Sequence, residues 1–149
     1  MKKFRFVLRP VSIVRTHRES RAREVFAASV HAYVRTEEDL AAVRARVAAF
    51  GASIFASRRE RFEAAEHAIC LAGYRRECAA EIPAERAVIA ARADMERRRS
   101  EYLEAHRNLE AVNKLEEKSR SAYRAAAGRE EQAEYDDRSP SARRALHGA

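Results

Sequence analysis

The stretch FAASVHAYVRTEEDLAAVRARVAAFGASI, residues 26–54, decides the fold. Large apolar side chains recur in it every seven residues, and two more stand three residues after members of this series. The set is Phe26, Tyr33, Leu40, Val47 and Ile54, with Val43 and Phe50 in the intermediate positions. A mean period of 3.5 residues is typical of helices that pack along one seam in a left-handed coiled coil. The stretch therefore predicts a long helix with a helical partner.

The same period returns in the second half of the chain. Val88, Met95, Tyr102 and Leu109 are seven apart and Tyr123 follows two heptads later, although Arg98 and Glu116 interrupt this seam. Between the halves the first seam shifts by one residue, to Phe55, Phe62 and Ile69, which indicates a bend or a local change in supercoil.

Pro83 separates the two seams and is well placed to begin a helix, because proline is favoured in a first helical turn. We expect an all-α fold of two long helices, residues 10–80 and 83–136, that form an antiparallel coiled-coil hairpin over residues 10–137. Residues 1–9 should be an extended lead-in. Residues 138–149 should be a flexible tail, since Ser139-Pro140 stops a helix, and Gly128 is a possible earlier stop.

In this hairpin the second helix pairs with residues 27–80, so residues 10–26 overhang. The overhang contains four basic side chains: Arg15, Arg18, Arg21 and Arg23. Residues 1–50 carry 11 cations and 5 acids, in a chain with 30 cations and 23 acids. This positive end would attract an acidic protein, an anionic lipid or a nucleic acid.

Composition supports helices and excludes several other classes. The chain has 149 residues, of which 32 are Ala, while Gly (4) and Pro (3) are too few for a fold rich in tight turns. No apolar run is long enough to span a membrane, and the Arg-rich start does not resemble a signal peptide, so a cytoplasmic protein is expected. Cys70 and Cys78 would lie ~12 Å apart on one helix, too far for a bridge.

No pattern of catalytic chemistry stands out. Glycines form no phosphate-binding loop, and no nucleophile elbow occurs. His67, with Glu63 and Cys70 one turn away, offers part of a zinc site that the second helix does not complete. We expect no catalytic residue, cofactor or metal. Acids interleaved with Arg97, Arg98 and Arg99 argue against nucleic-acid binding.

Three regions together resemble the flagellar export protein FliJ and its counterparts in virulence-type secretion, the YscO-like proteins. They are FRFVLRPV (residues 4–11), YLEAHRNLE followed by LEEK (102–110 and 115–118), and the acidic REEQAEYDD (129–137). The resemblance implies a non-enzymatic central-stalk and escort component of a type III export apparatus. Its implied partners are the export ATPase ring, a membrane export gate protein and export chaperones, at the cytoplasmic face of the inner membrane.

Two groups of residues are the candidate partner contacts of such a stalk, expected to be an elongated monomer within a larger complex. Helix-end residues would engage the ring: Phe4, Phe6, Arg15, Arg18, Arg21 and Arg23. Apolar residues left over from the seam shift, Phe55 and Phe62, would form a second surface near the hairpin. Two alternatives remain open from the residues alone: a coiled-coil scaffold or dimerising adaptor, and a basic nucleic-acid-binding protein.

Overall fold

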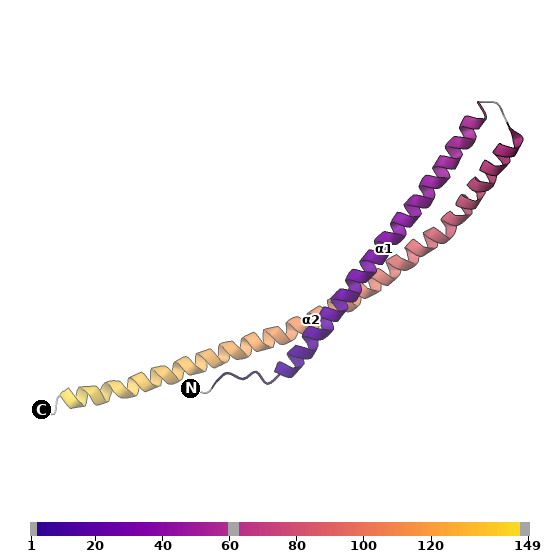
Figure 1. The fold of residues 1–149 in the computed structure, drawn as a ribbon. Coiled ribbons are helices and arrows are strands. Elements are labelled where there is room, and N and C mark those ends of the chain that lie inside the picture. Colours follow the sequence, from indigo (N-terminus) through magenta and orange to yellow (C-terminus); the bar gives the residue numbers. More distant parts are fainter. Residues whose placement is uncertain (1–2, 60–62, 147–149) are drawn as a thin grey trace. The chain divides into compact units, whose positions relative to one another are not determined.

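The computed structural model describes residues 3–59 and 63–146, with side chains described as far as residue 137. It contains two helices that pack against each other, α1 (Arg9–Ser57) and α2 (Ala64–Leu146), and no strand in the part described (Figure 1). The predicted all-α hairpin is thereby confirmed. The chain divides into two units, which we call the hairpin unit (residues 20–103) and the terminal unit (residues 1–19 and 104–149).

In the hairpin unit, α1 and α2 pack through the predicted seam. All seven predicted seam residues of α1 are half-buried or buried, and Val43 is only 7% exposed. The rings of Phe26 and Tyr102 stack across the helices, with centroids 6.0 Å apart. The hydroxyl of Tyr33 donates a hydrogen bond to the carboxylate of Glu37, which raises the pKa of the tyrosine. The period of 3.5 residues thus identifies the inner face of the hairpin.

The position of the turn differs from the prediction. Helix α1 ends at Ser57 and α2 begins at Ala64, so the predicted helices over residues 10–80 and 83–136 are wrong. Among the described residues here, Ile54 and the Cys70-Leu71 pair are half-buried, whereas Phe55 and Ile69 between them are exposed. The shift of the seam therefore marks the turn itself.

The predicted shifted seam is wrong as well. Phe55 is 62% exposed and Ile69 is 72% exposed, so neither packs between the helices. Phe62 lies outside the described residues. Phe55 and Ile69 instead lie on the surface beside the turn.

Pro83 lies inside α2 and does not begin it. A proline in a helix interior costs ~3 kcal/mol, because it removes one hydrogen bond and crowds the preceding turn. Cross-helix contacts flank it: Arg44 of α1 binds Glu81 at 2.8 Å and Glu85 at 2.7 Å. These hydrogen bonds raise the pKa of Arg44. Because exposed ion pairs contribute little, the apolar seam supplies most of the stabilisation that holds α2 together here.

Close to the turn, each helix places an aromatic ring against a glycine of the other. A Cβ atom added at Gly73 would lie 2.7 Å from a ring carbon of Phe50, inside contact distance. A Cβ atom added at Gly51 would meet the ring of Tyr74 at 3.9 Å, an ordinary contact. A hydrogen bond with Cys78 raises the pKa of the Tyr74 hydroxyl. A methyl group at position 73 would therefore force the ring of Phe50 to move, whereas position 51 has room for a methyl group.

In the terminal unit, the start of α1 lies along α2, and the seam between them is largely polar. Glu19 is only 5% exposed, and its carboxylate oxygen lies 3.5 Å from Nδ1 of His106. Val112, 3% exposed, is the buried apolar residue of this interface. The side chain of Arg15 donates a hydrogen bond of 2.6 Å to the backbone carbonyl of Asn108.

The expected overhang of residues 10–26 is therefore wrong. Ser12, Arg15 and Glu19 face α2 in the terminal unit, and Phe26 stacks on it in the hairpin unit. A turn near residue 60 shortens α1, so it is α2 that continues past the start of α1 (Figure 1).

Helix α2 also passes through two sites at which the sequence suggested a stop. Neither Gly128 nor Ser139-Pro140 ends it, and it continues to Leu146. The flexible tail predicted from residue 138 is accordingly wrong for residues 138–146, where alanine, arginine and leucine favour helix. Residues 147–149 lie outside the described residues.

Within the described residues, one helix, α1, has a segment long and apolar enough to cross a membrane by length and composition alone. No such segment was expected from the sequence. One such helix is weak support for a membrane span, because packed helices of soluble proteins and signal sequences meet the same two criteria. Arg46 of this helix binds Glu77 of α2 at 2.9 Å, an ion pair typical of a helix packed against a protein partner.

Candidate partner-binding surfaces

Two of the predicted contact residues in the terminal unit are engaged within the chain. The ring of Phe4 packs on Tyr123 with centroids 5.5 Å apart, and the guanidinium of Arg120 lies 5.6 Å from the centre of the same ring. Arg15 is half-buried and donates to the carbonyl of Asn108. Phe4 and Arg15 therefore hold the start of the chain against α2, and other residues are left to meet a partner.

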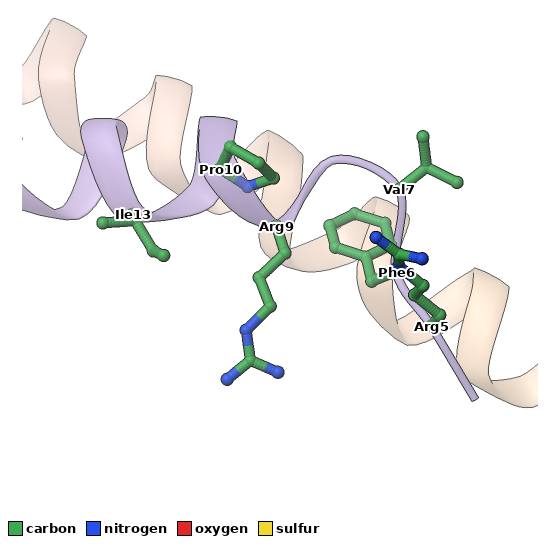
Figure 2. Close-up of a pocket in the computed structure, with 6 residues that line it drawn as sticks. All are labelled: Arg5, Phe6, Val7, Arg9, Pro10 and Ile13. Carbon is green, nitrogen blue, oxygen red and sulfur yellow. The ribbon is translucent and has the colours of Figure 1, made fainter. Parts of the chain in front are cut away.

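Phe6 lies beside a surface hollow at the start of α1. The hollow has a volume of about 540 Å³. Figure 2 shows its lining: Arg5, Phe6 and Val7 from the preceding segment, and Arg9, Pro10 and Ile13 from α1. An apolar floor between two guanidinium groups suits an apolar side chain that has carboxylates as neighbours.

Aliphatic side chains extend this surface along α1. Val7 is 85% exposed, Ile13 is 53% exposed and Val14 is 49% exposed. Leu8 and Val11 are less exposed, at 39% each. Together with the lining of the hollow they form what we call the N-terminal patch. Exposed apolar residues gathered in this way mark an interaction site.

The aliphatic part of this patch was not predicted from the sequence, although a signal was present. Continuing the 3.5-residue repeat backwards from Phe26 places Ser12, Arg15 and Glu19 on the inner face, where the structure has them. Ile13 and Val14, which lie between these positions, must then face outward. The repeat is hard to recognise there because its inner positions carry polar instead of apolar residues.

The other predicted arginines divide between the two units. Arg18 belongs to the terminal unit, while Arg21 and Arg23 belong to the hairpin unit. All three are exposed. Exposed guanidinium groups attract an acidic partner over long distances.

Phe55 is exposed at the last turn of α1, as a surface residue near the hairpin should be. The guanidinium of Arg59 lies 5.3 Å from the centre of its ring, a cation–π contact. The pair offers an aromatic edge and a positive charge beside the turn. The predicted companion of Phe55, Phe62, lies outside the described residues.

Metal ligands do not gather in the described part of the chain. No group of three or more histidine, cysteine, aspartate or glutamate side chains there could hold a metal ion. Cys70 and Cys78 are both free thiols. What the geometry offers is a pair of surfaces for macromolecular contact, one at the start of α1 and one beside the turn.

Comparison with known proteins decides the family. The model of the flagellar FliJ protein family matches residues 4–146, nearly the whole chain. The chain belongs to the FliJ family. It is therefore a component of the flagellar protein-export apparatus, in which this family has no enzymatic role. No curated protein and no solved structure matches it.

Proposed function

We propose that this FliJ-family protein is a central-stalk and escort component, which couples the export ATPase ring to the membrane export gate and assists delivery of chaperone–substrate complexes. It would work at the cytoplasmic face of the inner membrane. The observation that carries the proposal is the N-terminal patch: exposed aliphatic residues and arginines at the start of α1, in a member of an export family.

The physical case for a ring partner combines stiffness with charge. Helices that pack through a regular seam resist bending, as a stalk must. Exposed arginines at the start of α1 can steer the chain toward an acidic opening and orient it there. Phe4 and Arg15 contribute indirectly, because their contacts with Tyr123 and Asn108 fix the segment that carries the patch.

The second surface, at Phe55, is assigned to the gate. Among the described residues, Phe55 is an exposed aromatic side chain beside the turn, and its ring lies next to Arg59. Aromatic and arginine residues are enriched among the residues that dominate binding. The two surfaces belong to different units, so one chain can present them to different partners.

Removal of charge near the start of α1 should weaken binding to the ATPase. We expect the triple variant Arg18→Ser, Arg21→Ser, Arg23→Ser to lose about tenfold in affinity for the purified export ATPase at low salt, with helicity unchanged. Arg15 is left intact because it holds the fold. Titration of labelled protein with the ATPase, at two ionic strengths, measures the effect.

A matched triple on α2 controls for net charge. Arg75→Ser, Arg76→Ser, Arg86→Ser removes the same charge from other exposed positions and should bind the ATPase as well as the unmodified chain does. Phe55→Ala should also keep ATPase binding but lose binding to the gate protein. Equal losses in both arginine triples, or no loss in either at low salt, would count against the proposal.

A further inference from the structure

Beyond Tyr123, whose ring packs on Phe4, α2 carries an acidic surface. From Gly128 to Asp137 every side chain is exposed, and five of these ten residues are acidic. We call residues 128–137 the acidic extension. Tyr135 stands within it at 68% exposure, with carboxylates on both sides in the sequence. An exposed aromatic residue among carboxylates complements an apolar hollow between arginines, both in charge and in apolar character.

The N-terminal patch contains such a hollow, but the acidic extension of the same chain cannot reach it. Phe4 packs on Tyr123, and Arg15 binds Asn108, so the patch lies beside the α2 residues between these contacts. Tyr135 is twelve residues beyond Tyr123 on one helix, or about 18 Å further along the axis. The two surfaces therefore match but can meet only between two copies.

A simple symmetry brings them together. If two α2 helices lie antiparallel with residues near 126 at the centre, Tyr135 of each copy falls opposite residues near 117 of the other, where the partner's patch lies. The same contact then forms twice, as in an isologous dimer. The centre is Ala125-Ala126-Ala127-Gly128, whose small side chains allow close approach, and a Cβ atom added at Gly128 would meet nothing within 4 Å.

We propose that two copies of the free protein pair in this way, with the acidic extension of each chain on the N-terminal patch of the other. Opposite charge favours the acidic extension of a second copy as the ligand of the patch. In the dimer Glu130, Glu131 and Glu134 face a surface that bears Arg5 and Arg9. Tyr135 enters the hollow between the two arginines. The dimer covers the patch, so pairing competes with any export partner that uses it, and the chain is a monomer once that partner is bound.

Charge reversal tests the pairing with the full chain alone. One variant carries Arg5→Glu and Arg9→Glu, and the other carries Glu130→Arg and Glu134→Arg. Each faces like charges at both contacts of the dimer and should sediment as a 16.9 kDa monomer at concentrations where the unmodified chain pairs. Mixed in equal amounts, the two variants restore opposite charges at both contacts, and the dimer should return.

The control is Glu38→Arg with Asp39→Arg, an equal charge change on exposed residues of the hairpin unit, which should pair normally. Circular dichroism establishes that each variant is helical. Two results would overturn the proposal: an unmodified chain that stays monomeric at every concentration in low salt, or a mixture that fails to restore the dimer. No export partner is present, so either result leaves the proposed ATPase and gate contacts to their own binding test.

Discussion

Replacing Val43 with aspartate is expected to destabilise the hairpin unit by at least about 3 kcal/mol, the largest effect anticipated for a single substitution. The side chain is 7% exposed, so the change removes a buried apolar group and puts a carboxylate in its place. The free energy of unfolding, measured with urea by circular dichroism, should fall accordingly.

Val34→Asp provides the matched comparison. Val34 lies on the same helix nine residues earlier and is 42% exposed, so its carboxylate would remain in water. We expect its unfolding free energy to change by less than ~1 kcal/mol. Similar losses in the two variants would mean that Val43 does not lie in a packed seam.

The second large effect concerns the two glycines near the turn. Both Gly→Ala changes gain about 1 kcal/mol from helix propensity. At Gly73 the new methyl group must displace the ring of Phe50, and such overpacking costs ~1–3 kcal/mol. Gly51→Ala meets Tyr74 at an ordinary distance and keeps its gain. Gly73→Ala should therefore unfold about 1–3 kcal/mol more easily than Gly51→Ala.

Double-variant analysis locates the cause of that difference. In a Phe50→Ala background the ring is gone, so Gly73→Ala should become as favourable as Gly51→Ala. Persistence of the difference without the ring would show that Phe50 does not pack on Gly73. The same urea transitions measure all of these variants.

The sequence predicts the inner face of the hairpin well because burial repeats with a fixed period. Residues such as Leu40, Val47, Met95 and Leu109 are apolar at every second helical turn, and the structure places them between the helices. The periodic pattern is sufficient here, since a coiled coil is stabilised mainly by one seam.

The position of the turn could not be read from the strongest helix breaker. Pro83 has a local preference for a helix start, but packing along α2 outweighs its cost. The better signal was weaker: the unbroken seven-residue repeat that begins at Phe26 ends at Ile54. A seam that loses its apolar residues is a more reliable sign of a turn than a single proline.

The candidate surfaces were predicted only in part, for a related reason. Phe55 was expected on the surface as an apolar residue left over from the seam shift, and it is exposed. The start of α1 was expected to overhang, so Phe4 and Arg15 were assigned outward roles, although they contact α2. Assigning those roles depends on the register of the two helices, which follows from the position of the turn.

The central claim is that the chain folds back near residue 60, and one distance tests it. Spin labels at Ala41 and Arg86, both exposed, in a chain with Cys70→Ser and Cys78→Ser, report the separation by pulsed electron resonance. Helices packed at 8–10 Å predict labels about 20 Å apart. A first helix continuous to residue 80 would instead separate them by about 50 Å. The short distance is the expected result, and the long one would contradict the fold and the surfaces derived from it.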